Sequence, residues 1–77
     1  MDEIVLEAGI PLEVTPTTTT MIYNNMLGND SLFVSSHGDV SKKWLRVEQG
    51  DYCKFVNVVW LMQNTSGQVV IPAFEIS

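Results

Sequence analysis

The stretch Ile10–Thr15 reads Ile-Pro-Leu-Glu-Val-Thr, with apolar side chains at every second position. A two-residue period places Ile10, Leu12 and Val14 on one face of an extended strand and the other side chains on the opposite face. Pro11 has no amide hydrogen to give to a ladder, so it places the strand at a sheet edge or turns that position away from a neighbouring strand. The stretch therefore predicts an edge strand.

Turn-forming residues divide the rest of the chain into short segments, with glycines at intervals of 10 to 19 residues. One such turn is expected at 27–31, where glycine, asparagine and aspartate gather. Segments rich in β-branched and aromatic residues, or apolar at alternate positions, are 4–6, 10–15, 21–26, 32–34, 44–48, 55–62 and 68–76. No stretch supports a helix of about ten residues. The sequence predicts an all-β fold: a small antiparallel β-sandwich or barrel of six to seven short strands, in a single domain over residues 1–77.

Three details of these strands are also expected. Apolar residues fall on both faces of 55–62, which predicts one strand covered on both sides and places Trp60 in the core. Pro72 is expected to interrupt the last strand, and Gly9 makes either a short hairpin or a bend in one continuing strand. Residues 1–8 are a candidate extended arm that adds a strand to a neighbouring subunit.

Charge and composition exclude several classes of partner. The chain has nine acidic and four basic residues, a net charge of -5, which opposes attraction to phosphate backbones, so no nucleic-acid partner is expected. No apolar run approaches the roughly 18 residues that span a bilayer, so no membrane partner is expected. One cysteine and one histidine supply neither an internal disulfide nor a zinc site. No metal or other cofactor is expected.

Two local patterns are candidates for catalysis, and each has a simpler explanation. His37-Gly38-Asp39 sets an imidazole beside a carboxylate, the combination used in general base catalysis, but glycine and aspartate are also ordinary turn residues. Lys54 beside Cys53 would lower the pKa of a thiol, but adjacent side chains of a strand point to opposite faces. We therefore expect a turn, a half-buried thiol and a protein that is not an enzyme.

The aromatic residues indicate a binding surface. The chain has two Trp, two Tyr and three Phe, more than so small a core encloses, so some must be partly exposed. Trp44 lies in the basic segment that contains Lys42, Lys43 and Arg46, and it either covers the core or anchors an interface with acidic residues of another copy. The candidate interface residues are Ile4, Leu6, Pro11, Lys42, Lys43, Trp44 and Arg46.

Four stretches resemble small phage virion proteins, which include capsid decoration proteins and head-fibre base modules. They are Ala-Gly-Ile-Pro-Leu-Glu-Val at 8–14, Ile-Tyr-Asn-Asn-Met-Leu-Gly-Asn-Asp-Ser-Leu-Phe-Val-Ser-Ser at 22–36, Leu-Arg-Val-Glu-Gln-Gly-Asp-Tyr at 45–52 and Thr-Ser-Gly-Gln-Val-Val-Ile at 65–71. The shared features are strands that end in asparagines or meet Gly-Asn and Gly-Asp turns. Trp44 and the threonine run at 17–20 depart from the pattern.

The resemblance implies a non-enzymatic structural subunit of a virion, assembled in the host cytoplasm. Its expected partners are further copies of itself, commonly as a homotrimer, and the major capsid protein or another virion protein. Self-association also suits the size, because a chain of 77 residues buries too little surface to be very stable alone. The alternative function is a small acidic phage-encoded binding module that inhibits a host protein.

Overall fold

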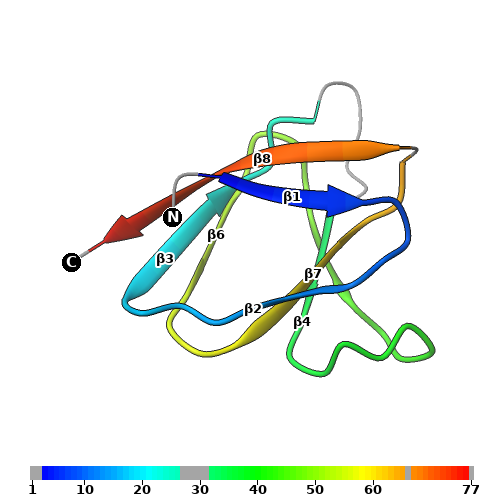
Figure 1. Ribbon diagram of the computed structural model, residues 1–77, viewed down its shortest axis with the longest axis horizontal. Helices are drawn as coiled ribbons and strands as arrows, with labels where there is room; N and C mark the ends of the chain where they lie inside the picture. Colours follow the sequence, from blue (N-terminus) through cyan, green and yellow to red (C-terminus); the bar gives the residue numbers. More distant parts are fainter. Residues whose placement is uncertain (1–2, 27–31, 66, 77) are drawn as a thin grey trace.

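The computed structural model describes residues 3–26, 32–65 and 67–76, which form two antiparallel sheets packed face to face (Figure 1). The first sheet has the strand order β1-β8-β3-β6 and the second the order β2-β7-β4-β5. The strands are β1 (Glu3–Glu7), β2 (Leu12–Val14), β3 (Thr19–Tyr23), β4 (Leu32–Ser35), β5 (Leu45–Val47), β6 (Tyr52–Phe55), β7 (Val59–Gln63) and β8 (Gln68–Ile76). The all-β sandwich is confirmed, although the described residues form eight strands rather than six or seven. The turn expected at 27–31 lies outside the described residues.

The additional strand arises where 55–62 was expected to be one strand. The chain leaves the first sheet after β6, turns through Val56–Val58 and enters the second sheet as β7. Val56 and Val58 are exposed at this corner, whereas Phe55 and Leu61 are buried. The corner therefore lets Phe55 and Leu61 enter one core from opposite sheets.

Pro72 does not interrupt the last strand. The first half of β8 pairs with β1, in a ladder that ends at the Glu3–Pro72 pair. The second half pairs with β3, in a ladder that begins at Ala73. Pro72 thus lies where one partner strand ends and the other begins, a position at which a missing amide donor costs the sheet little.

Of the arm expected at 1–8, residues 1–2 lie outside the described residues, and residues 3–7 belong to the sandwich and do not extend as an arm. Every residue of β1 is paired with β8, from Glu3 to Glu7. The apolar side chains of Ile4 and Leu6 point inward and are buried, Leu6 completely. The alternation that suggested an adhesive arm is instead the pattern of a strand with one face in its own core.

Gly9 makes a bend between two separate strands, β1 in the first sheet and β2 in the second, so it forms neither a hairpin nor a bend within one continuing strand. Its φ of 74° lies in the left-handed region, which glycine adopts without strain. Its amide donates to the Gln63 carbonyl at 2.9 Å. Beyond the bend, half-buried Pro11 leads into β2, which lies at the edge of the second sheet as the sequence predicted.

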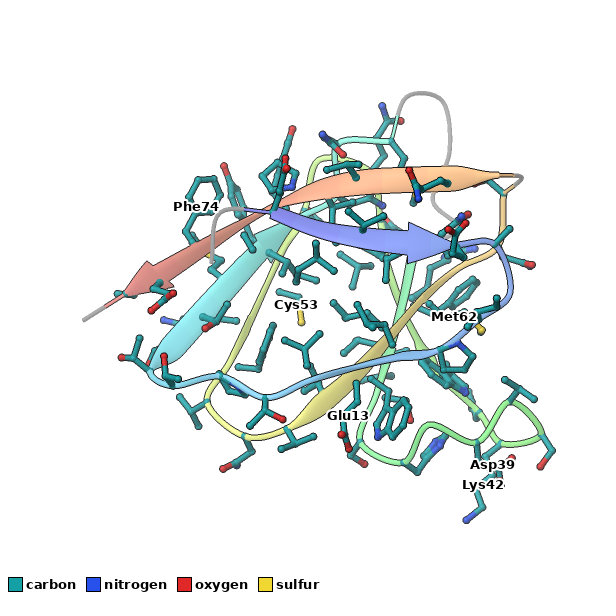
Figure 2. All side chains as sticks on the ribbon, in the orientation of Figure 1. Glu13, Asp39, Lys42, Cys53, Met62 and Phe74 are labelled. Carbon is teal, nitrogen blue, oxygen red and sulfur yellow. The ribbon has the colours of Figure 1, made fainter. Side chains whose placement is uncertain are left out.

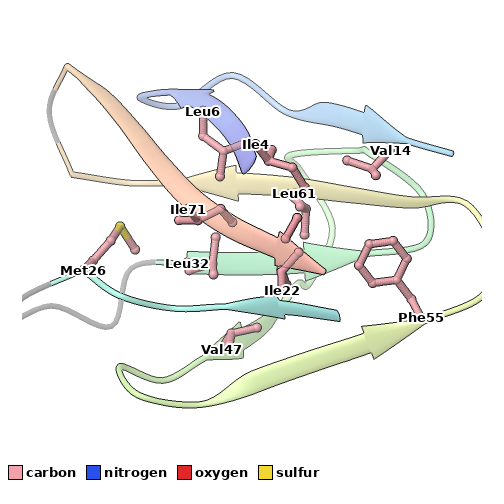
Figure 3. Close-up of a cluster of buried hydrophobic side chains, with 11 residues drawn as sticks. Ile4, Leu6, Val14, Ile22, Met26, Leu32, Val47, Phe55, Leu61 and Ile71 are labelled. Atoms are coloured by element: carbon pink, nitrogen blue, oxygen red, sulfur yellow. The ribbon is translucent and has the colours of Figure 1, made fainter. Parts of the chain in front are cut away.

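The core is a single apolar cluster between the sheets (Figure 3). Inward-facing side chains alternate with outward-facing ones along the strands of both sheets, and the inward-facing side chains of the two sheets form the cluster. Its buried side chains are Ile4, Leu6, Val14, Ile22, Met26, Leu32, Val47, Phe55, Leu61, Ile71 and Ala73.

Two buried amide side chains join separate segments of the fold. Asn24 donates to the Val47 carbonyl at 2.8 Å and accepts from the Met26 amide at 3.0 Å. Gln63 donates to the carbonyls of Leu6 and Gly67, at 3.2 and 2.9 Å. Because buried amides are costly unless they are satisfied, these side chains favour one arrangement of the strands.

Candidate interaction surface

Lys42, Lys43 and Trp44 lie in the loop between β4 and β5 of the second sheet, and Figure 2 shows Lys42 at the opposite end of the molecule from Phe74. Lys42 and Lys43 are exposed, and Trp44 is half-buried. The indole nitrogen of Trp44 donates to the Asp39 carbonyl at 2.9 Å, and its ring meets the His37 ring edge-on, with 5.6 Å between centroids. Trp44 therefore packs within its own loop.

Arg46 lies on the outer face of β5, at the edge of the second sheet. Its guanidinium is 3.6 Å from the Glu48 carboxylate, and both side chains are more than half exposed. Water and salt screen such a surface pair, so it adds little to stability. Of the predicted interface residues, Lys42, Lys43 and Arg46 are accessible to a partner, whereas Ile4 and Leu6 are in the core.

The residues His37 and Asp39 form a turn network rather than a base beside a free carboxylate. The Asp39 amide donates to His37 Nδ1 at 2.9 Å, and His37 Nε2 lies 3.1 Å from the Lys43 carbonyl. The Ser41 hydroxyl and amide both donate to the Asp39 carboxylate, at 2.7 and 2.9 Å. The hydroxyl bond, followed by the amide bond, holds the pKa of Asp39 below its ordinary value. The imidazole and the carboxylate thus both form hydrogen bonds within the loop.

Gly38 lies against the face of Trp60, which projects from the outer side of β7 and is not a core residue. A methyl group on Gly38 would meet ring carbon Cδ2 of Trp60 at 2.5 Å, closer than atoms tolerate. The φ of Gly38 is also positive, at 71°. Trp60 is therefore only half-buried because the loop, and not the opposite sheet, covers it.

Gly38→Ala is expected to lower the free energy of unfolding by about 2–3 kcal/mol, because it adds a steric clash to the left-handed strain of about 1 kcal/mol. Gly50→Ala is the matched control, since Gly50 has a φ of 84° but no atoms within 4 Å of the place a methyl group would take. We expect Gly50→Ala to lower the free energy of unfolding by about 1 kcal/mol, which is the cost of the left-handed strain alone. Urea unfolding followed by tryptophan fluorescence measures both, and equal losses would show that Gly38 does not pack on Trp60.

Cys53 and Lys54 lie on opposite faces of β6, as expected from the strand geometry. Cys53 is half-buried and packs against the core, and burial raises the pKa of its thiol. Lys54 is exposed on the outer face. A raised pKa disfavours the thiolate, so this pair lacks the features of an activated nucleophile.

The outer face of the first sheet carries apolar and aromatic side chains, and sequence reasoning did not identify it. Three cross-strand pairs meet there: Val5 with Val70, Met21 with Phe74 and Tyr23 with Tyr52. Phe74 projects outward from β8 (Figure 2), while Cys53 lies between the sheets. We call this surface the apolar face, and define it by Val5, Met21, Tyr23, Tyr52, Val70 and Phe74.

The apolar face is accessible to a partner. Tyr52 is 59% and Phe74 48% exposed, and Val5 and Val70 are exposed to a similar degree. The rings of Tyr23 and Tyr52 lie 4.9 Å apart, tilted by 38°, so they form one aromatic unit. A contiguous apolar patch of a few hundred square ångströms on a soluble protein is often an interaction site, whereas single exposed apolar residues are ordinary.

The charged residues on this side of the first sheet lie near its edges. Glu3 and Glu7 project from β1, where Glu7 Oε1 accepts a hydrogen bond from Gln68 at 3.1 Å. Lys54 projects from β6, beside Met21. The apolar side chains thus lie between acidic residues on one edge strand and a basic residue on the other.

One sequence signal pointed to this surface. The segment 68–76 contains Val69-Val70-Ile71, which is apolar on both faces of a strand. Such a run indicates that both faces are covered, and the core covers only the face with Ile71 and Ala73. The pairing with β1 and β3 was needed to show that Val70 and Phe74 join other apolar side chains.

The described residues include no cluster of three or more potential metal-ligating side chains. They also include no helix long and apolar enough to cross a membrane. Comparisons of the chain with protein-family models, with curated proteins and with solved structures give no match.

Proposed function

We propose that this protein is a non-enzymatic binding subunit that acts by protein–protein adhesion through the apolar face. The observation that supports the proposal is the group of paired, exposed apolar and aromatic side chains on the first sheet. Tyrosine and phenylalanine supply large contact areas with few rotatable bonds, so they lose little entropy on binding. Removing this surface from water supplies the free energy of adhesion.

We further propose that the adhesive subunit belongs to a phage virion, as a homo-oligomeric capsid decoration or accessory protein. The support is the resemblance in strand and turn pattern, together with a small sandwich that offers one broad apolar surface. In this role the apolar face joins copies of the subunit, and the assembled copies bind a capsid protein. Each contact adds interfacial free energy that holds the shell against internal pressure.

The test is a mass-spectrometric inventory of purified virions of the phage that encodes the chain, with a Phe74→Arg phage beside the wild type. We expect the wild-type chain in a fixed copy number per particle and at least tenfold fewer copies of the variant. Phe74 is 48% exposed, so arginine is expected to leave the fold intact, which circular dichroism of the purified variant checks.

A chain that is absent from virions and co-purifies with one host protein would contradict the virion proposal and support the alternative, a host inhibitor. Lys42→Glu serves as the control, because Lys42 is exposed in the loop of the second sheet, away from the apolar face. The control separates loss of the apolar contact from a general effect of changed surface charge.

A further inference from the structure

The two edges of the first sheet carry opposite charges, and this pattern is complementary to itself. Glu3 and Glu7 project beside the apolar face from edge strand β1, and Lys54 projects from edge strand β6. We propose that the apolar face is the contact surface of a two-fold dimer of this chain, in which the β1 edge of each copy lies over the β6 edge of the other. This inference rests on the proposed function, because it names a second copy as the adhesion partner.

The direction of the two-fold axis follows from the strand order. If the axis runs parallel to the strands, between β8 and β3, the rotation reverses the strand order of the second copy. Its strands then lie over the first sheet in the order β6-β3-β8-β1, so that β6 of each copy covers β1 of the other. Lys54 of each copy then lies near the partner's Glu3 on both sides of the interface, whereas Glu7 lies further along β1, away from Lys54. An axis perpendicular to the strands lays β1 over β1 and sets carboxylates against carboxylates, which opposes association.

The ladder registers make one contact specific. They align Glu3 on edge strand β1 with Tyr52 on edge strand β6, so that both residues lie at the same level along the strands. Lys54 lies one outward-facing position from Tyr52, about 7 Å along the strand. The partner's Glu3 therefore lies over Tyr52, within reach of the flexible Lys54 side chain. Two-fold symmetry makes this contact twice.

The same axis brings apolar side chains together at the centre. Met21 and Phe74 are paired in neighbouring strands on either side of the axis. Phe74 of one copy thus packs on the partner's Met21, and aromatic rings and methionine sulfur make favourable contacts. The dimer would be a four-layered β structure whose new interior is made from the apolar faces of both copies.

The size of the face predicts a reversible dimer. Four strands about 4.8 Å apart, with about five residues of about 3.3 Å each, make a face of roughly 300 Å² in projection. Interfaces of this size lie at the lower end for specific contacts, below about 1,200 Å² in total. The contact uses the same surface on both copies and closes on itself, so we expect a dimer and not the trimer that the resemblance implies.

A charge-exchange experiment on the intact chain tests the dimer and its axis. Dilution calorimetry gives the dimer dissociation constant for the wild type, Lys54→Glu, Glu3→Lys and the double variant. We expect each single change to weaken the dimer about tenfold, because repulsion replaces attraction twice, and the double variant to recover to within about threefold of the wild type. Both side chains are exposed, so all four proteins are expected to fold, which circular dichroism verifies.

Lys42→Glu makes the same charge change away from the apolar face and is expected to leave the dissociation constant within about twofold of the wild type. A monomeric wild type, a trimer, or a double variant as weak as the single variants would overturn the inference. The virion inventory is independent of this result. A chain found in virions but monomeric in solution would retain the virion role and overturn the dimer, whereas a dimer absent from virions would retain self-adhesion through the apolar face and overturn the virion role.

Discussion

Leu6→Ala is expected to lower the free energy of unfolding by about 3 kcal/mol or more, a large part of the total for so small a domain. Leu6 is 0% exposed, and its strand pairs along its whole length with β8. The substitution removes buried methyl groups and leaves a cavity at the junction of the sheets. If residues 1–8 were an arm, the same change would affect assembly and leave folding unchanged.

Leu45→Ala is the matched control, because it makes the same chemical change at a leucine that is 71% exposed on edge strand β5. We expect it to cost less than about 1 kcal/mol. Urea unfolding at low micromolar concentration, where a weak dimer is dissociated, gives both values. Equal losses for the two leucines would contradict the position of β1 in the core.

Gln63→Leu is expected to cost about 3 kcal/mol, because it leaves several buried polar groups without partners. The Gln63 side chain is fully buried and donates to the carbonyls of Leu6 and Gly67. Its oxygen accepts from the amide of Thr65 at 2.7 Å and also from the Thr65 hydroxyl. The Gln63 side chain therefore joins its own strand, β7, to β1 and to the turn before β8.

The control for this prediction is Gln49→Leu, at an exposed position in the turn between β5 and β6. That change is expected to alter the free energy of unfolding by no more than about 0.5 kcal/mol. Denaturant titrations of both variants measure the difference. A Gln63→Leu protein as stable as the wild type would show that the buried amide network contributes little to the fold.

The sequence predicted the class of the fold because alternation is a local property. Burial alternates along β1, and Pro11 correctly marked the edge strand β2, although of the apolar residues Ile10, Leu12 and Val14 only Val14 is buried. The corner at Val56–Val58 was missed because its residues are valines and asparagine within an apolar run. β-Branched residues favour extended backbone in a strand and in a corner alike, so only the pairing partners reveal the break.

The buried amides were missed for a different reason. Asn24 and Gln63 lie beside turn residues, where polar side chains are normally solvated. Their burial depends on carbonyls of Val47 and Leu6, which are far away in the sequence. Such non-local contacts leave no trace in the spacing of one chain.

The sequence predicted that some aromatic residues are exposed, but not which residues form the candidate site. The number of aromatic residues correctly required some of them to be exposed, and Tyr52 and Phe74 are. The interpretation centred on Trp44 because three basic residues surround it in the sequence. The apolar face is assembled instead from four strands in the order β1-β8-β3-β6, and that order cannot be read from periodicity.

Adhesion through the apolar face is tested most directly by sedimentation equilibrium of the wild type and Phe74→Arg between about 1 and 200 µM, the range in which a small interface associates. For the wild type, we expect the average mass to rise with concentration from 8.6 kDa toward twice that value, whereas Phe74→Arg stays at the mass of one chain. A wild type that stays at one chain throughout, or a variant that associates as strongly as the wild type, would contradict self-adhesion through this face.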